Sequence, residues 1–287
     1  MTARDTLFAF IAVLGWGINF VVMKVGVHEI PPLLLLGLRF ALVAAIVVPF
    51  VARPKGKLGL IALLALLLGA GNFGLLFIAM KTLDAASASI TIQLSVPFSA
   101  IIAAVCYKET LGWLGGLGML LAYGGVALLS GEPQHPDPFA LLLVLLSAAS
   151  WALSNVVVKK IGDVDPLTLN GWMALLATPQ LLLLSALFEQ GQIDSLRQAS
   201  WIGWSALAYT VLIHSLLVYT LWYKLIARYP LNRVVPFSLM VPVVGIAAGV
   251  FMLGEPLGWH RMVGGALTVF GVAVIQFRPR VTLAKGR

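Results

Sequence analysis

Long apolar stretches separated by short polar breaks run through the whole chain. A helix needs ~20 mostly apolar residues to cross the hydrocarbon layer of a membrane. Stretches of that length predict ten spans, at about 6–25, 33–52, 58–80, 85–106, 112–130, 138–160, 167–187, 201–224, 231–253 and 259–277. The longest connection, roughly residues 188–200, is too short for an aqueous domain. We therefore expect an all-α polytopic membrane protein with ten transmembrane helices.

The composition agrees with a chain whose main solvent is lipid. Apolar residues make up 60% of the 287 positions and charged residues only 10%, and the mean hydropathy is +0.99. The surface of a soluble protein of this size does not tolerate such a balance. The first apolar stretch is longer than the core of a cleavable signal peptide and lacks a small-residue cleavage pattern, so we expect it to remain as the first helix.

The basic residues alternate from one connection to the next. The amino terminus and the even-numbered connections together hold 14 of the 19 Lys and Arg residues, the other side holds four, and Arg39 lies inside a span. The positive-inside rule therefore predicts an inner-membrane protein with both termini in the cytoplasm. Topology accounts for the net charge of +8, so we expect the lipid bilayer and no nucleic acid as a partner.

The two halves of the chain repeat one another. The motif at 109–113 matches the motif at 255–259. Three earlier residues recur at a constant offset of 135, namely Trp16, Lys24 and Pro31 as Trp151, Lys159 and Pro166. Residues 1–131, with helices 1–5, therefore correspond to residues 132–287, with helices 6–10 and a short basic tail. Because five is odd, the second half is inverted, and a pseudo-two-fold axis in the membrane plane relates the halves.

These repeated residues resemble a known family. The pattern is Gly15-Trp16-Gly17-Ile18-Asn19-Phe20 with Lys24, then Leu38-Arg39-Phe40, then Pro97 followed by Lys108-Glu109-Thr110-Leu111. It is similar to the EamA-type repeat of the drug/metabolite transporter superfamily, and the resemblance covers essentially the whole chain, twice. The second copy departs from the first, since Ala174 takes the place of Arg39 and Gly254-Glu255-Pro256 replaces Lys108-Glu109-Thr110.

The resemblance implies a transporter and not an enzyme. Ten-helix members of the superfamily include exporters of amino acids and other metabolites, and this chain is most similar to the aromatic amino-acid exporter branch. An inverted repeat also implies alternating access, because exchanging the shapes of the two halves closes one face and opens the other. The rival functions are export of drugs or other small metabolites, an intramembrane enzyme, and a non-transporting scaffold.

Polar and aromatic side chains away from the helix ends mark a candidate substrate path, because such groups are unfavourable in lipid unless they pair or line a cavity. The candidate binding residues are Trp16, Asn19, Asn72, Gln93, Ser95, Trp151, Ser154, Asn155, Tyr209 and His214. Indole rings can stack on an aromatic or apolar side chain, and amides and hydroxyls can hydrogen-bond a zwitterionic head group. The alternative is that the tryptophans pack the helices and the polar groups tie them together.

Two prolines and one arginine have other expected roles. Pro97 and Pro242 are candidate hinges, since a proline inside a helix removes one backbone hydrogen bond, although a plain kink is the alternative. Arg39 lies about seven residues into its span, so we expect it to snorkel and to anchor or tie helices, with direct contact to the substrate as the alternative. Glycines at 115–125 and 264–271 predict close packing of the fifth and tenth helices or a dimer seam.

Carboxylates and metal ligands are placed unfavourably for ion coupling or cofactor chemistry. None of the eleven acidic residues falls in the middle of a predicted span, where proton- or sodium-driven carriers usually place one. We therefore expect facilitated diffusion. The single cysteine, Cys106, and four histidines without ligand spacing predict neither a metal site nor another cofactor. Both a monomer and a homodimer agree with the sequence.

Overall fold

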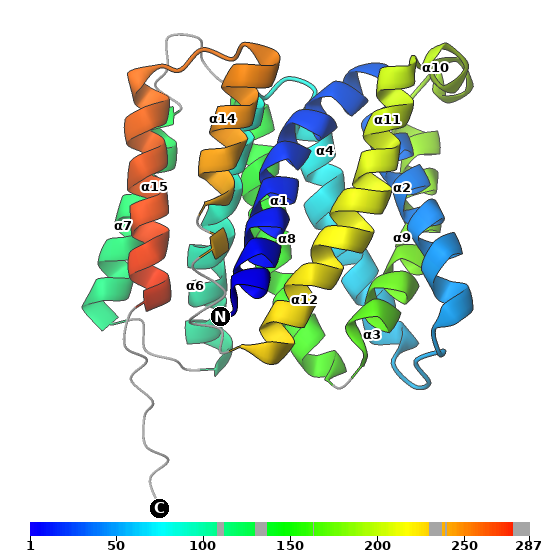
Figure 1. Ribbon diagram of the computed structural model, residues 1–287, viewed down its shortest axis with the longest axis horizontal. Coiled ribbons are helices and arrows are strands. Elements are labelled where there is room, and N and C mark those ends of the chain that lie inside the picture. Colours follow the sequence, from blue (N-terminus) through cyan, green and yellow to red (C-terminus); the bar gives the residue numbers. More distant parts are fainter. Residues whose placement is uncertain (108–111, 130–136, 163, 230–236, 239, 278–287) are drawn as a thin grey trace, which may run out of the picture.

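The chain forms a bundle of helices (Figure 1). The computed structural model describes residues 1–107, 112–129, 137–162, 164–229, 237–238 and 240–277, and it has no strand among them. Residues 108–111 of the first repeated motif, the predicted boundary at 131–132 and the basic tail at 278–287 lie outside the described residues.

Each predicted span of the first half coincides with one helix or with several helical segments in line. They are α1 (Ala3–Glu29); α2 (Pro32–Val47) with the 3-10 turn η1 (Val48–Phe50); α3 (Leu58–Leu64), the π-helical η2 (Ala65–Gly74) and α4 (Leu75–Ala79); α5 (Ala85–Thr91), the 3-10 turn η3 (Ile92–Leu94) and α6 (Ser95–Tyr107); and α7 (Gly112–Leu129).

The second half repeats this order. Its elements are α8 (Pro138–Ile161); α9 (Pro166–Phe188); the short connecting α10 (Gln192–Gln198); α11 (Trp201–Tyr209), the π-helical η4 (Thr210–Val218) and α12 (Tyr219–Arg228); α14 (Val241–Leu253); and α15 (Trp259–Phe277). Among the described residues, six helices are long and apolar enough to cross a membrane, and α7, α14 and α15 provide shorter apolar helices. The prediction of an all-α polytopic membrane protein is confirmed.

The helix contacts are those expected if a two-fold axis relates each helix of the first half to its equivalent in the second. The equivalent helices α2 and α9 pack on each other, and so do α7 and α15. α1 packs on α14 and on the α11–η4–α12 segment, while its equivalent α8 packs on α5–η3–α6 and on α3–η2–α4. The π-helical segments η2 and η4 occupy matching places as well. This pairing is the one expected of an inverted repeat.

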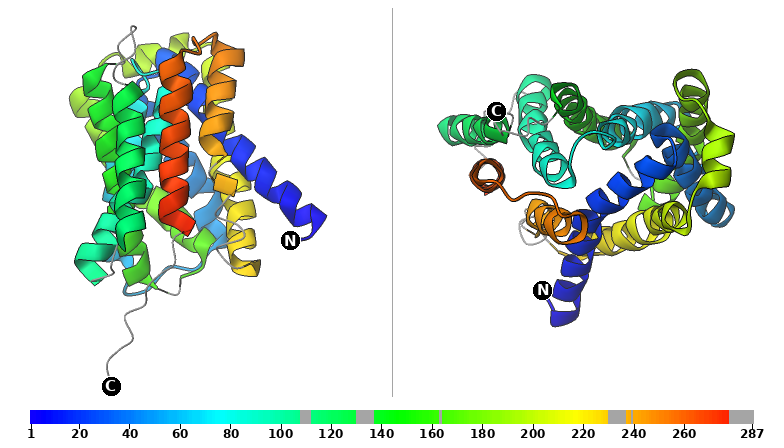
Figure 2. Two further views of the ribbon diagram at one scale, coloured as in Figure 1. Left: turned by 90° about the vertical axis from the view of Figure 1, so that its left-hand side faces the viewer. Right: turned by 90° about the horizontal axis from the view of Figure 1, so that it is seen from above.

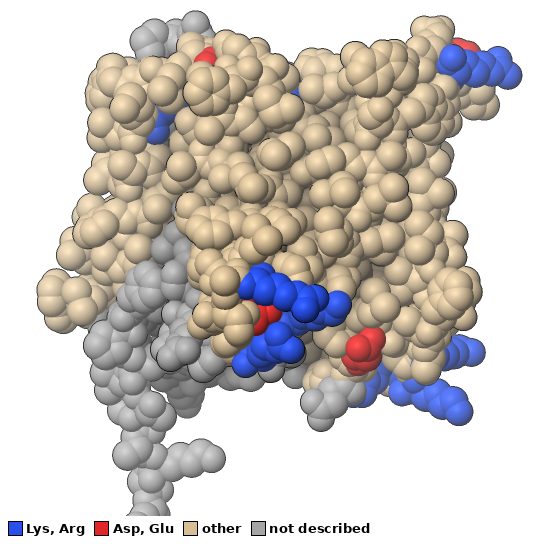
Figure 3. Space-filling view, in the orientation of Figure 1, with Lys and Arg blue, Asp and Glu red and all other residues tan. Residues whose placement is uncertain are grey.

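The bundle has two ends, which we call the amino-terminal end and the distal end. The amino-terminal end carries the start of α1 and the connections at 51–57 and 162–165, and the distal end carries α10 and the connections at 80–84 and 254–258 (Figure 1). α1 runs obliquely, with its start at the periphery (Figure 2). On the face drawn in Figure 3, charged side chains gather toward the two ends and leave a broad uncharged band between them.

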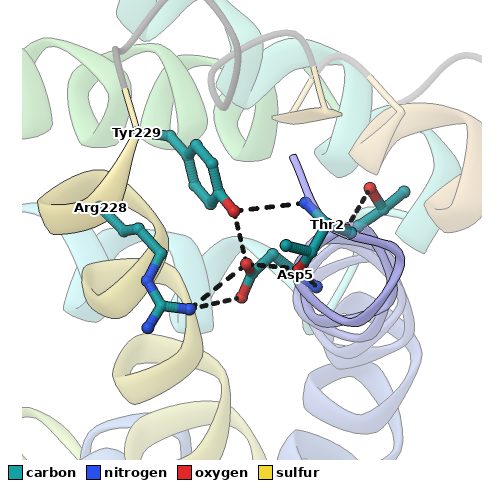
Figure 4. A network of polar contacts seen from close by, with 5 residues as sticks. Thr2, Asp5, Arg228 and Tyr229 are labelled. Carbon is teal, nitrogen blue, oxygen red and sulfur yellow. Dashed lines mark hydrogen bonds and ion pairs between the residues drawn. The ribbon is translucent and has the colours of Figure 1, made fainter.

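A polar network joins the start of α1 to the end of α12 (Figure 4). The Asp5 carboxylate, whose residue is 3% exposed, accepts hydrogen bonds from the Thr2 and Tyr229 hydroxyls and pairs with Arg228 Nη1 at 3.3 Å. Because Asp5 lies in the first turn of α1, its charge also interacts favourably with the helix dipole. The network thus fixes these two helices to each other at the amino-terminal end.

Glycines let α7 and α15 approach closely, as the sequence predicts. A Cβ atom placed on Gly271 would lie 2.5 Å from the Ala122 backbone N and 2.5 Å from the Gly118 carbonyl O. These are backbone atoms, which cannot move without separating the helices. A packing seam within the chain therefore accounts for this glycine pattern.

We expect Gly271→Ala to destabilise the protein by about 1–3 kcal/mol, the usual effect of overpacking a tight contact. Gly124→Ala is the matched control, because a Cβ there meets nothing within 4 Å and alanine is the better helix former. Thermal unfolding of the two variants in detergent provides the comparison. Equal unfolding temperatures would contradict the packing role.

Candidate functional site

Two neighbouring cavities lie inside the bundle. The central chamber, of about 280 Å³, is lined by seven of the ten predicted binding residues, namely Trp16, Asn19, Asn72, Gln93, Ser95, Trp151 and His214. The amino-terminal chamber, of about 370 Å³, is lined by Ser154 and Asn155, again with Trp16 and Trp151. Gly162, Val164 and Pro166 also line it, so this chamber reaches the connection after α8 at the amino-terminal end.

Aromatic side chains form the wall common to both chambers. The shared residues are Trp16, Phe73, Trp151, Tyr219 and Trp222. Trp16 packs edge-to-face on Trp222, with ring centroids 4.7 Å apart, and on Tyr219 at 6.0 Å. The wall can therefore stack against a planar or apolar ligand, and a movement of these rings would join the two chambers.

Asn19 retains an unused hydrogen-bond acceptor in the central chamber. Its residue is 4% exposed, and its side-chain Nδ2 donates to the Met23 sulfur at 2.9 Å. Its Oδ1 is buried and has no hydrogen-bond partner. Because a buried acceptor without a donor is unfavourable, this oxygen is suited to accept a hydrogen bond from a ligand.

The polar groups of two other predicted residues form hydrogen bonds within the protein. The Asn72 side-chain amide donates to the Ser147 carbonyl and hydroxyl oxygens, both at 3.0 Å, and so joins η2 to α8. The Ser154 hydroxyl donates to the Trp151 carbonyl within α8, at 2.7 Å. The Asn72 contact fits the alternative hypothesis of helix ties, whereas the Ser154 contact stays within its own helix; both residues also line a chamber.

Tyr209 and Pro242 lie differently from the prediction, whereas Pro97 lies inside its predicted span. Tyr209 lines neither chamber, because its hydroxyl donates to the Gly15 carbonyl at 2.9 Å and ties α11 to α1. Pro97 is buried and is the third residue of α6, so the N–H it lacks would have pointed back toward Gln93 in the 3-10 turn η3. Pro242 occupies the start of α14, where no helical hydrogen bond is lost, so its predicted position inside a helix is wrong.

The expectation that Arg39 snorkels is also wrong. The residue is 1% exposed and lies halfway along α2. Its Nε donates to the Ser215 hydroxyl at 3.0 Å, and its Nη2 lies 2.8 Å from His214 Nδ1. Because a guanidinium can only donate, Nδ1 must accept, and the His214 ring is neutral with its proton on Nε2. Arg39 thus holds His214 in a form that carries no extra proton.

Several wall residues are not among the ten candidate binding residues. Phe73, Tyr219, Trp222 and Ser238 line the central chamber, and Arg39, Ser215 and Asn170 line the amino-terminal one. Tyr219 and Trp222 are three residues apart on α12 and so share a helix face, which is a signal that the sequence contained. Phe73 carries no such signal beyond its place next to Asn72.

Polar contacts, which we call the distal ties, join helix ends beyond the central chamber, and all but the Lys24 contact cross from one half to the other. Their donors and acceptors are Lys24 Nζ and the Leu83 carbonyl (2.6 Å), Ser200 N and Glu29 (2.7 Å), Leu33 N and Glu189 (2.8 Å), Ala85 N and Glu255 (2.7 Å), and Arg261 and Asp84 (3.2 Å). They bind the distal ends of α1, α5 and α11 to their neighbours. These contacts hold the helix ends together at the distal end.

The electrostatics of this end are set by burial and by backbone N–H groups. Burial raises the pKa of the Glu255 carboxyl, and the N–H groups of Ala85 and Ala86 act in the opposite direction. The hydroxyl of Thr82 lowers the pKa of Asp137, which begins α8. No group of three or more His, Cys, Asp or Glu residues that could hold a metal occurs in the described part of the chain.

Comparisons with known proteins agree with this architecture. Residues 5–131 and 138–277 match the model of the EamA-like transporter family. The chain is 38% identical to a protein of Salmonella typhimurium named "Probable amino-acid metabolite efflux pump", with 98% of this chain and 97% of that protein covered. An Escherichia coli protein of the same name is 34% identical over 96% of both chains. A solved crystal structure superposes with a TM-score of 0.64 at 19% identity, over 96% of both chains.

We expect water-soluble reagents to reach the amino-terminal chamber but not the outer surface of the helices. In a Cys106→Ser background, Asn155→Cys should react with a hydrophilic thiol reagent, because Asn155 is exposed and lines that chamber. Leu212→Cys is the control, since Leu212 is 53% exposed on η4 but lines neither chamber and should face lipid. Equal labelling of the two positions would contradict a water-filled chamber.

Proposed function

Because the chain belongs to the EamA-like transporter family, we propose that it exports amino acids, aromatic and other neutral ones among them, through its two chambers. Two relatives that share at least a third of their residues with it are named as probable amino-acid metabolite efflux pumps. The observation that carries the proposal is the aromatic wall beside an unsatisfied Asn19 acceptor. The wall suits an apolar or aromatic side chain, and the Asn19 oxygen suits an ammonium group.

The proposed mechanism is alternating access between the two repeated halves. The distal ties close one end, while the amino-terminal chamber reaches the opposite connection. If both termini are cytoplasmic, as the basic residues predict, this conformation receives substrate from the cytoplasm. Exchange of shapes between the halves would then break the distal ties and release substrate outside.

The proposed energy source is the substrate gradient alone. No carboxylate lines either chamber among the described residues, and His214 is held neutral by Arg39. A proton or sodium ion therefore has no obvious carrier on the path. The same lack of a carboxylate disfavours cationic drugs as substrates, because no group offers them a counter-charge. Intramembrane catalysis is not supported, since the family and the named relatives are transporters.

Counterflow in reconstituted vesicles tests the proposal. Vesicles preloaded with unlabelled phenylalanine should take up labelled phenylalanine, and an imposed pH gradient should leave the final level unchanged. Trp151→Ala should lower the exchange rate about tenfold, because it removes an aromatic surface common to both chambers. Trp204→Ala, on a tryptophan that is 45% exposed and lines neither chamber, is the control and should keep the wild-type rate.

The results discriminate among the hypotheses. No exchange of any neutral amino acid would exclude the proposed substrate class. Accumulation several-fold above equilibrium that follows the pH gradient would refute passive transport. Equal loss of activity in the Trp151 and Trp204 variants would refute the aromatic wall as the substrate surface.

Alternating access predicts that weakening the distal ties exposes the central chamber from the distal side. Glu255→Gln should do so, because a neutral amide offers a single oxygen to two backbone N–H groups. A Met23→Cys reporter in the central chamber, in a Cys106→Ser background, should then react several-fold faster with a reagent added on the distal side. Asp194→Asn, an exposed acidic residue at the same end, is the control. Unchanged labelling in the Glu255 variant would show that the distal ties do not control access.

A further inference from the structure

We propose that Arg39 binds the carboxylate of the transported amino acid. This inference rests on the export function proposed above and identifies the side chain that would recognise the carboxylate of the substrate. It assigns to Arg39 a role in substrate recognition that a helix tie or an anchor would not require.

The first observation is that a buried cation lacks a counter-ion. Arg39 is 1% exposed, and no carboxylate forms an ion pair with it among the residues that the structure describes. Its Nη1 has no hydrogen-bond partner. An isolated buried charge is strongly unfavourable, and a permanent role in the fold is normally accompanied by a partner of opposite charge.

The second observation is that neutral groups hold the guanidinium in place. Ser215 and His214 accept two of its hydrogen bonds. Its Cζ lies 4.9 Å from the ring centroid of Phe73 and 5.3 Å from that of Phe40, so both rings contribute cation–π attraction. These contacts orient the group without neutralising it. The charge therefore remains available for an anion that binds and leaves.

The third observation is the location of Arg39 on the transport path. Arg39 lines the amino-terminal chamber together with Phe73 and Tyr219, which also belong to the wall shared with the central chamber. Nη1 is enclosed in this conformation. A carboxylate would reach it after those rings move, so binding would be coupled to the joining of the chambers. Asn19, with its unsatisfied oxygen, lines the central chamber, which the same ring movement would join to the chamber of Arg39.

The pair of unsatisfied groups defines the class of substrate. A donor that carries full positive charge matches the carboxylate of an amino acid, an acceptor without a donor matches its ammonium group, and the aromatic wall matches an apolar side chain. An amine without a carboxylate would satisfy Asn19 and leave Arg39 unpaired. An acid without an amine would do the reverse.

Competition against phenylalanine counterflow in reconstituted vesicles tests this assignment. The competitors are phenylalanine, phenylalaninamide, which lacks the carboxylate, and 3-phenylpropionate, which lacks the amine. In the wild type, phenylalaninamide should compete at least about tenfold more weakly than phenylalanine, because a charge-assisted hydrogen bond is lost. 3-Phenylpropionate should compete measurably.

Variants separate recognition from a structural role. Arg39→Gln should bring phenylalanine and phenylalaninamide to within about twofold of each other and abolish competition by 3-phenylpropionate. Arg39→Lys keeps the charge and should retain part of the discrimination. Arg197→Gln is the matched control, because it makes the same substitution at an exposed arginine that lines neither chamber. It should preserve the wild-type order of competitors.

Each outcome decides the question. Folded Arg39→Gln protein that keeps the wild-type order of competitors would overturn the proposal, and so would wild-type protein that accepts phenylalanine and phenylalaninamide equally. In both cases the export function would still stand. If Arg39→Gln does not fold, the Arg39→Lys and wild-type competition patterns decide in the same way. Absence of phenylalanine exchange in the wild type would instead refute the export function.

Discussion

The hydrocarbon interior of a membrane offers no water to a polar group, and this constraint governs where the chain places its charges. All eight described carboxylates contact or lie within the first turn of a helix: Asp5, Glu29, Asp84, Asp137, Asp165, Glu189, Asp194 and Glu255. Six of them accept hydrogen bonds from backbone N–H groups that have no partner within the helix, and Asp5 and Asp194 lie near the positive end of the helix dipole. Where the carboxylate and the helix belong to different halves, the same interaction joins the halves. The need to satisfy charges at the helix ends thus also holds the two halves together at the distal end.

Much of the fold follows from local sequence properties, whereas its interruptions do not. The length of each apolar stretch fixes the spans, and the constant offset between Trp16 and Trp151 predicts the repeat that the helix pairing reflects. The division 1–131 and 132–287 stays a prediction. The sequence does not predict the π-helical segments η2 and η4, because a change in hydrogen-bond register leaves the hydrophobic pattern intact. It also gives no way to tell that Pro242 begins a helix instead of interrupting one.

The site shows the same division between local and long-range information. Trp16 and Trp151 could be predicted as a pair because the repeat axis brings equivalent positions together, and both line both chambers. The environment of Arg39 could not, because its hydrogen-bond partners lie 175 and 176 residues away on η4. Distance from the helix end suggested snorkelling, but a side chain inside a bundle follows the partners that neighbouring helices supply. Asn72 illustrates the converse, since its polarity marked it for substrate and its contact with Ser147 uses it for packing.

The two halves differ at the position of Arg39, where exact symmetry would place a second buried arginine. Arg39 on α2 meets His214 on η4, so the symmetric contact is between α9 and η2. In that contact the offset of 135 places Ala174, a fully buried residue of α9, at the position equivalent to Arg39. Close by on the same helix, Ala177 packs tightly against Gly69 of η2. A second arginine in that position would give the cavity two cations and favour a ligand with two negative groups. Replacing it with small residues leaves one positive group on one side of the aromatic wall and packs the equivalent helix closely on the other. A zwitterion is itself asymmetric, so its binding site need not be symmetric. The helix pairing, in contrast, keeps the two-fold symmetry that alternating access needs.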